Sequence, residues 1–218
     1  MRAVRFLSPH RGQVSCQHEH SSVQSYLYFS FKRPVQFLKS SCGREMSDNA
    51  SKWSATANSY STTVVKLTGQ GGEVLLRLVE SVRPFDDSAV VLDSGAGSGA
   101  LTALLRQISS KMPVVATDVA PGMLEMLAKR DIPNLKTLLL DASGDHIAQG
   151  LQEDHFTHAL TTFMLQFINP AKQAVAEMCR VLQPGGIIGN AIWSASGCTD
   201  LWSRAVKTVD PSFQSRDM

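Results

Sequence analysis

The stretch Ala89–Thr102, AVVLDSGAGSGALT, constrains the fold of this chain more than any other part. A short β-branched run ends in Asp93, glycines follow at 95, 97 and 99, and a leucine-rich helical pattern comes next. This order predicts a buried strand, a tight turn and the start of a helix. Because glycine has no Cβ, the backbone of such a turn can come close to a ligand, and the free N–H groups of a helix start favour nucleotide-like groups. The stretch therefore predicts a nucleotide-like ligand.

Two later runs repeat the pattern of a strand followed by an aspartate. Residues 114–117 lead to Asp118, and residues 136–140 lead to Asp141. In open α/β folds the carboxyl ends of parallel strands share one edge of the sheet, and ligands bind at that edge. We therefore expect the carboxylates of residues 93, 118 and 141 to lie along one edge.

The remainder of the chain continues the alternation of strand and helix patterns. A polar lead-in helix is expected over 53–60, further strands over 157–163 and 186–193, and helices over 72–82, 99–109, 121–130, 170–182 and 200–209. Regular alternation calls for a parallel sheet with right-handed crossovers and helices on both faces. The predicted fold class is α/β, a Rossmann-like, doubly wound, mostly parallel sheet.

Four motifs carry a resemblance to a known family. Asp93-x-Gly-x-Gly-x-Gly99 resembles motif I of the class I S-adenosylmethionine-dependent methyltransferases, and Thr117-Asp-Val-Ala-Pro-Gly-Met-Leu124 resembles their second motif. Leu140-Asp-Ala142 is similar to the third motif, and Leu182-Gln-Pro-Gly-Gly-Ile187 to the turn before the fifth strand. The spacing is similar to the small-molecule branch that includes the ubiquinone/menaquinone-type, methyltransferase type 11-like enzymes. The resemblance runs from about residue 53 to residue 193.

The resemblance implies S-adenosylmethionine as cofactor and in-line methyl transfer to a small-molecule acceptor. Asp93 would orient the glycine loop and accept from the cofactor ammonium, Asp118 would accept from the ribose hydroxyls, and Asp141 from the adenine amino group. The predicted cofactor-binding residues are Asp93, Gly95, Ala96, Gly97, Gly99, Asp118, Val119, Met123, Asp141, Ala142, Thr162 and Phe163.

Each of these assignments has a purely structural alternative. Asp93 and Asp141 could be turn aspartates that cap nearby backbone N–H groups, and Asp118 could be the N-cap of the helix that begins near Pro121. Met123 on a helix could equally be part of the core. The residue pattern alone leaves these alternatives open.

The acceptor and the catalytic residues are less well specified. Phe163, Met164 and Phe167 could line an apolar acceptor pocket or fill the core, and Trp53 and Tyr60 are expected to close over the site. No general base is predicted, since the histidines at 146, 155 and 158 are expected on the surface or in loops. Methyl transfer from an activated sulfonium requires positioning and exclusion of water, so a strong catalytic motif is not needed. Whether oxygen, nitrogen or carbon is methylated is left open, as is the acceptor, which we expect to be small and aromatic or lipophilic.

Several ligand classes are disfavoured. Asn169-Pro170 is followed by Ala171-Lys172 instead of a second proline and an aromatic residue, and no Pro-Cys pair appears, so the nucleic-acid methyltransferase motifs are absent. Residues 46–218 carry fourteen basic and seventeen acidic side chains, which gives no electrostatic footprint for nucleic acid. No apolar run is long enough to span a bilayer, and the four cysteines lack metal-ligand spacing. We expect no metal and make no prediction about oligomeric state.

The two ends of the chain differ from the middle. Residues 1–45 carry seven basic and two acidic side chains and many serines, which suits either a mitochondrial targeting segment or a disordered extension that precedes a working start at Met46. We expect this segment to be disordered and the protein to be cytoplasmic, with a mitochondrial location as the alternative. Residues 46–218 are expected to form the methyltransferase domain, truncated after the fifth strand. Without the family's antiparallel seventh strand beside it, that fifth strand would be an exposed edge.

Two other functions compete with methyl transfer. Gly95-x-Gly97-x-x-Ala100 also satisfies a permissive dinucleotide-binding fingerprint, which would suit a nicotinamide-dependent oxidoreductase. Asp93 two residues before the first glycine argues against that function, as does Pro184-Gly-Gly186 before a strand. A methyltransferase-like domain without activity, binding cofactor only or serving a structural role, is the other alternative.

Overall fold

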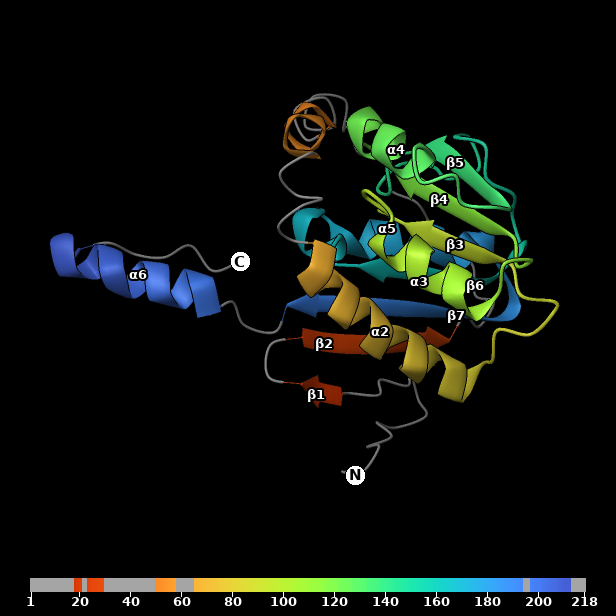
Figure 1. Cartoon of the computed structure of the whole chain (residues 1–218), viewed down its shortest axis with the longest axis horizontal. Helices are drawn as coiled ribbons and strands as arrows, with labels where there is room; N and C mark the ends of the chain where they lie inside the picture. Colours follow the sequence, from red (N-terminus) through yellow and green to blue (C-terminus); the bar gives the residue numbers. More distant parts are fainter. Residues whose placement is uncertain (1–17, 21–22, 30–49, 58–64, 194–196, 213–218) are drawn as a thin grey trace.

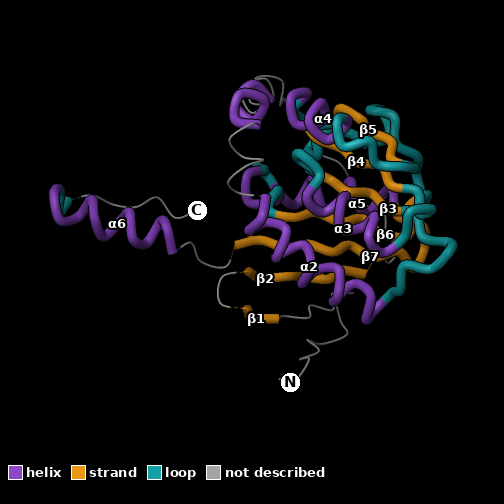
Figure 2. Tube along the Cα trace, in the orientation of Figure 1, coloured by secondary structure: helices purple, strands orange, loops and turns teal. Residues whose placement is uncertain are grey.

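The protein is described by a computed structural model that covers residues 18–20, 23–29, 50–57, 65–193 and 197–212. A seven-stranded sheet with helices on both faces forms the body, in the strand order β1-β2-β7-β6-β3-β4-β5 (Figure 1). Strands and helices alternate along the trace from residue 65 onwards, except that β6 follows β5 with no helix between them (Figure 2). The predicted α/β class is confirmed.

Five parallel strands make up the part of the sheet that the sequence predicted. Their bounds are β3 (Val91–Ser94), β4 (Val114–Asp118), β5 (Leu135–Leu139), β6 (Phe156–Thr162) and β7 (Leu182–Trp193). In the register, Asp93 lies opposite Ala116 on one side and Leu160 on the other. Each strand is within a few residues of its predicted position, and β7 starts earliest relative to prediction because it includes the Pro-Gly-Gly turn.

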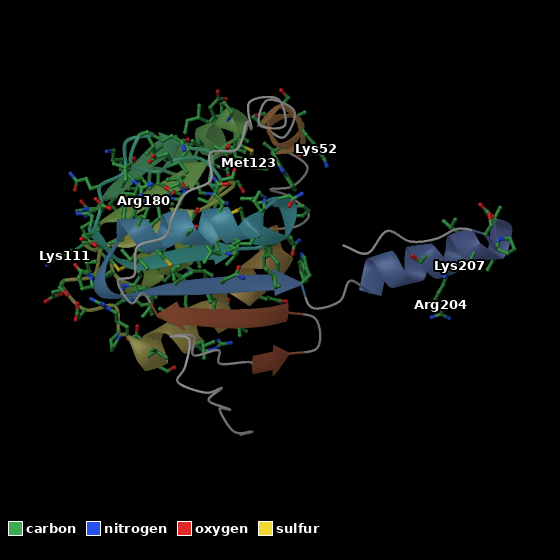
Figure 3. All side chains as sticks on the ribbon, turned by 180° about the vertical axis from the view of Figure 1, so that it is seen from behind. Lys52, Lys111, Met123, Arg180, Arg204 and Lys207 are labelled. Atoms are coloured by element: carbon green, nitrogen blue, oxygen red, sulfur yellow. The ribbon has the colours of Figure 1, made fainter. Side chains whose placement is uncertain are left out.

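Helices cover both faces of this sheet. They are α2 (Val65–Val82), α3 (Ala100–Ile108), α4 (Pro121–Ala128), α5 (Ala171–Val181), α6 (Gly197–Val209), the 3-10 turn η1 (Leu165–Phe167), and an unlabelled lead-in helix over residues 50–57. Figure 1 shows α2 and α3 in front of the sheet, and the reverse view in Figure 3 shows α5 covering the other face. Helix α6 extends away from the sheet (Figure 1).

Successive residues of the central strands enter opposite cores. Val91 and Ile187 pack in the cluster formed with α2 and α3, whereas Leu92 and Ile188 pack in the cluster formed with α5. A strand that is buried on both faces needs a continuous apolar run, because its side chains alternate between the two faces. This is why the β-branched run before Asp93 specifies a central strand.

Helix α2 begins at Val65, seven residues before the predicted start. The prediction placed the start at Gly72, where the amphipathic run begins, although glycine is unfavourable inside a helix. A Cβ at Gly72 would lie 3.0 Å from Leu104 Cδ1, so the glycine lets α2 pack closely on α3. Tertiary packing thus outweighs the local cost of glycine at this position.

The N-terminal segment contains two strands, β1 (His18–His20) and β2 (Val23–Phe29). Strand β2 pairs antiparallel with β7, in a register that runs from Val23 opposite Trp193 to Phe29 opposite Ile187. The prediction of disorder is therefore wrong for these residues, and the prediction that the fifth parallel strand is an exposed edge is also wrong. Pairing with β2 satisfies backbone N–H and C=O groups that β7 would otherwise present unpaired. Residues 1–17, 21–22 and 30–49, and with them Met46, lie outside the described residues.

No helix in the described ranges combines the length and the apolar character that crossing a membrane requires.

Candidate functional site

A cavity opens at the carboxyl edge of the sheet, where the loops after β3, β4, β5 and β6 meet the lead-in helix. Its lining residues are Trp53, Gly95, Gly97, Asp118, Val119, Met123, Leu140, Asp141, Ala142, Ser143, Thr162, Phe163, Met164, Phe167, Ile168 and Asn169. Figure 3 shows Met123 next to the lead-in helix, which carries Lys52. The edge of the sheet that the sequence selected is therefore the edge that carries the cavity.

Nine of the twelve predicted cofactor-binding residues line this cavity, and Asp93, Ala96 and Gly99 do not. The backbone N–H of Ala96 donates to the carbonyl of Thr117 at 2.9 Å, which ties the turn to β4. A Cβ on Gly99 would lie 2.3 Å from Leu127 Cδ1, so this glycine admits α4. Glycine spacing in the sequence cannot separate glycines that face a ligand from those that face a helix.

The turn after β3 depends on glycine for its conformation. Gly95, Gly97 and Gly99 have φ angles of 70°, 56° and 85°, in the left-handed region that side chains rarely adopt. A Cβ on Gly95 would lie only 2.4 Å from Met164 Cγ. The glycine turn after β3 and the loop after β6 are therefore in direct contact at the wall of the cavity.

Asp93 lies behind the glycine turn and is fully buried. Its Oδ2 accepts a hydrogen bond from the Thr102 hydroxyl at 2.6 Å, whereas its buried Oδ1 has no hydrogen-bond partner among the described residues. Burial raises the pKa of the Asp93 carboxyl to about 7, with a smaller contribution from the nearby Asp118 charge, and the Thr102 hydrogen bond opposes the rise. Contact between Asp93 and a cofactor ammonium stays a prediction.

Asp118 joins two loops. Its Oδ2 accepts from the Gly97 N–H at 2.8 Å, and its Oδ1 accepts from the Ala120 N–H at 2.9 Å. Burial raises the pKa of Asp118, while these backbone hydrogen bonds act in the opposite direction. The capping alternative is thus part of the structure, but a carboxylate has about four acceptor positions, so it can still accept from ligand hydroxyls.

Asp141 combines a turn role with a free oxygen. Its Oδ1 accepts from the N–H and the hydroxyl of Ser143, at 2.9 and 2.8 Å. Its Oδ2 accepts no hydrogen bond from the described residues. Leu140, directly before Asp141, and Ser143, two residues after it, also line the cavity. Neither of them was predicted from the sequence as a lining residue.

A second set of residues that line the cavity is apolar and aromatic. The rings of Trp53 and Phe167 meet edge to face, with centroids 5.1 Å apart, and Phe163 stacks on Trp193 at 4.3 Å. Phe163 has a φ of 57°, and its N–H donates to Ala191 O at 2.7 Å. Phe163, Met164 and Phe167 all line the cavity as predicted, and Ile168 and Asn169 extend this wall. Tyr60 lies outside the described residues.

The lead-in helix is seated on the start of α4. The Gly122 N–H donates to Ser54 Oγ at 3.3 Å, and a Cβ at position 122 would lie 3.2 Å from Ser54 Cα. Ala57, Ala120 and Met123 form a small buried cluster beside this contact. Gly122 therefore allows the helix that carries Trp53 to reach the cavity.

The prediction that the histidines are surface or loop residues is wrong for His158, which is fully buried in β6. His146 lies in a loop as predicted, but its side chain is fully buried. His158 stacks on Phe85, and its Nε2 lies 3.0 Å from Arg83 O. His155 is exposed as expected. None of the three lines the cavity, and among the described lining residues the ionisable ones are Asp118 and Asp141. Among the described residues no group of three or more His, Cys, Asp or Glu could hold a metal ion.

Comparison with known proteins gives a consistent result. Residues 92–189 match the methyltransferase domain family. Over 120 residues the chain is 27% identical to methyltransferase tpcH of Aspergillus fumigatus, which covers 50% of this chain and 41% of that protein. Over 96 residues it is 35% identical to demethylmenaquinone methyltransferase of Renibacterium salmoninarum, which covers 44% and 38%. The chain thus spans about two fifths of the length of these two curated relatives.

A solved structure shares the fold. The DhpI–SAM–HEP complex superposes with a TM-score of 0.55 at 17% identity, over 81% of this chain and 76% of that one. At this identity the likeness concerns the fold alone, and it extends beyond the 92–189 match to most of the chain.

Proposed function

Residues 92–189 form a class I S-adenosylmethionine-dependent methyltransferase domain, and from this premise we propose that the protein transfers a methyl group from S-adenosylmethionine to a small-molecule acceptor. The observation that carries the proposal is that one cavity is lined by two chemically different sets of residues. The polar set contains the carboxylates of Asp118 and Asp141, and we name it the polar or cofactor end. The aromatic set contains the rings of Trp53, Phe163 and Phe167, and we name it the acceptor end.

The residues at the polar end fit the cofactor. Gly95 and Gly97 leave the backbone open to its amino-acid part, and Asp118 has acceptor capacity left for the ribose hydroxyls. The free Oδ2 of Asp141 suits the adenine amino group, and the apolar side chains of Met123 and Leu140 line the same end and suit the faces of the base. The orphaned Oδ1 of Asp93 behind the turn supplies a further acceptor toward the cofactor ammonium.

When bound, the cofactor supplies a methyl group on a sulfonium, which is already activated toward a nucleophile. The protein has to hold the acceptor atom about 3–3.5 Å from that methyl carbon and to exclude water. Trp53, Met164 and Phe167 provide an apolar wall for this purpose. Among the described lining residues no side chain is a histidine, lysine, cysteine or tyrosine, so none of these groups is available to deprotonate the acceptor. An aromatic or lipophilic molecule that ionises by itself matches such a wall.

Cofactor binding without methyl transfer is the second candidate function. The chain spans about two fifths of the length of the two relatives, so more than half of each relative lies outside the matched region. Transfer of a labelled methyl group separates the two candidates, because a binding-only domain takes up the cofactor and yields no labelled product.

The proposal is tested by calorimetric titration of the purified chain with S-adenosylmethionine and, in parallel, with NADH. We expect micromolar binding of the first and none of the second. Incubation with methyl-labelled cofactor and a panel of phenolic, quinol and carboxylic acceptors then measures transfer. Binding of NADH alone would overturn the proposal, and binding of S-adenosylmethionine with no transfer to any acceptor would favour the second candidate.

A further inference from the structure

The turn over residues 145–150 lies behind the two residues that we assign to the adenine, Asp141 and Ala142. We propose that two side chains of this turn, Gln149 and His146, are positioning residues that set the base selectivity of the site. They do so by holding the backbone of Asp141 and Ala142 in the arrangement that reads adenine. This inference rests on the proposed function and deepens it.

Gln149 binds both backbone groups of Asp141. Its Oε1 accepts from the Asp141 N–H at 2.8 Å, and its Nε2 donates to Asp141 O at 3.1 Å. The same Nε2 donates to Asp145 O at 3.2 Å. A Cβ on Gly144 would lie 2.6 Å from this Nε2, so the glycine leaves the space that the amide occupies. The primary amide of Gln149 therefore binds both backbone groups of Asp141, as the backbone of a neighbouring strand would.

His146 holds the next residue. Its Nε2 lies 3.1 Å from Ala142 O, and because a carbonyl oxygen can only accept, this nitrogen carries the hydrogen. Burial lowers the pKa of His146, which keeps the ring neutral at neutral pH, although the Ala142 hydrogen bond and the Glu177 charge oppose that shift. The imidazole thus fixes the carbonyl of Ala142 from inside the protein.

Helix α5 anchors this turn. The backbone N–H of His146 donates to Glu177 Oε2 at 2.8 Å, and Glu177 is itself buried. The Arg180 guanidinium, labelled in Figure 3, donates to both Glu177 oxygens at 3.1 and 3.0 Å and to Asp145 at 3.2 Å. The buried carboxylate is therefore paired, and the turn cannot shift without breaking this pairing.

These contacts decide which polar groups remain for a ligand. The N–H and C=O of Asp141 are both used by Gln149, and Oδ1 is used by Ser143. What remains is one acceptor, Asp141 Oδ2, and one donor, the Ala142 N–H. Adenine presents the complementary pair, an amino donor beside a ring-nitrogen acceptor, whereas hypoxanthine presents the reverse. A site built for one hydrogen-bond pattern rejects a ligand that leaves its groups unpaired.

The test compares two ligands that differ only at the base, S-adenosylhomocysteine and S-inosylhomocysteine. Their dissociation constants are measured by calorimetry on the full chain and on Gln149→Met, which keeps the size of the side chain and removes its hydrogen bonds. Gln152→Met is the matched control, because Gln152 is exposed and three residues further on. Gly144→Ala is the second variant, since its Cβ displaces the Gln149 amide without removing it.

We expect the natural chain and Gln152→Met to prefer the adenine ligand by roughly 100-fold. In Gln149→Met and Gly144→Ala we expect this preference to fall by about 10-fold, through weaker binding of the adenine ligand alone. An unchanged preference, with only a lower melting temperature, would mean that Gln149 is merely structural and would overturn the inference. Binding of neither ligand by the folded natural chain would instead overturn the proposed function itself, so the two failures are distinguishable.

Discussion

The two ends of the cavity are built in different ways. At the cofactor end, Asp118 and Asp141 each accept hydrogen bonds from backbone N–H groups that lie close to them. At the acceptor end, Trp53 meets Phe167 through ring packing. The first end is therefore fixed by hydrogen bonds from backbone N–H groups to carboxylates, and the second by ring packing between segments that are far apart in the sequence.

This difference teaches where each property of the site resides. Under the proposed function, turn geometry and charge are expected to set the affinity for the cofactor, and the docking of the lead-in helix is expected to set the shape offered to the acceptor. Substitutions at one end should therefore leave the other end's ligand almost unaffected. The predictions below test that separation.

The largest effect is expected from the pH dependence of Asp93, which supports the cofactor end from behind. The pKa of its carboxyl in the folded protein is about 7, above its usual value of 3.8. The folded state therefore holds a proton that the unfolded state releases, and the stabilisation is fully present below pH 3.8 and is lost as pH rises through about 7. Between pH 5 and 8 the loss is roughly 3 kcal/mol.

Urea unfolding at several pH values measures this loss, with Asp93→Asn as the reference because asparagine does not titrate. The difference in unfolding free energy between the natural chain and Asp93→Asn should shrink or change sign across this range. Parallel curves for the two proteins would contradict the assignment. A ligand ammonium favours the ionised carboxylate, so cofactor binding should tighten over the same range and release a proton.

Gly95→Ala should break the cofactor end most directly among the substitutions. The new Cβ would be forced against Met164 in a backbone conformation that alanine adopts with strain. We expect at least a 100-fold loss of S-adenosylmethionine affinity, or about 3 kcal/mol. Calorimetric titration measures it.

Gly69→Ala is the matched control for that substitution. No atom lies within 4 Å of the Cβ it would introduce, and position 69 is inside α2. Alanine in a helix interior is favoured over glycine by about 0.5–1 kcal/mol, so this variant should be as stable as the natural chain or more so. Equal losses of cofactor affinity in both variants would show that the effect is unspecific.

Asp118→Ala should have a smaller effect than Gly95→Ala at the same end. The variant loses the links to Gly97 and Ala120 and two charge-assisted hydrogen bonds to ribose. We expect binding of S-adenosylmethionine to weaken by ~1.5–3 kcal/mol. The same titration with 2′-deoxy and 3′-deoxy cofactor analogues localises the loss, since the variant should no longer distinguish them from the natural cofactor. An unchanged affinity would refute the ribose assignment.

The same contrast explains what the sequence could predict. The glycine turn, Asp118 and Asp141 are read correctly as cavity residues because each follows directly from a strand end, and the period of the strand is a local property. Leu140 and Ser143 were missed although they share these strand ends, because an apolar or small polar residue carries no signal of its own. Gly99 was predicted to face the ligand, whereas the side chain that it makes room for is Leu127. This is a tertiary contact, which glycine spacing in the sequence does not reveal.

The errors at other sites have the same cause. His158 was expected in a loop or at the surface, but its ring finds a backbone acceptor at residue 83, which satisfies it in the core. His146 is in a loop as expected, but it is buried because its ring binds the carbonyl of residue 142. The pairing of β2 with β7 joins residues more than 150 positions apart. The local sequence of a basic, serine-rich segment does not indicate which strand it will pair with. A single sequence does not reveal such contacts between residues that are far apart along the chain.

The smallest predicted effect belongs to the acceptor end. Trp53→Ala removes the edge-to-face contact with Phe167, which is worth about 0.5–1.5 kcal/mol beyond burial, and opens the wall of the cavity. We expect the KM for a methylated acceptor to rise about 10-fold. The dissociation constant of S-adenosylmethionine should change less than about 3-fold, because the polar groups that hold it are unaltered.

Trp53→Phe distinguishes wall packing from a specific role of the indole. Phenylalanine keeps an aromatic ring opposite Phe167, so this variant should recover most of the acceptor affinity that Trp53→Ala loses. If both variants weaken cofactor and acceptor equally, the lead-in helix supports the whole cavity and the two ends are not separable. If only the KM for the acceptor changes, then Trp53 contributes to acceptor binding alone, although it lies more than a hundred residues from Phe167 in the sequence. The two ends are then separable.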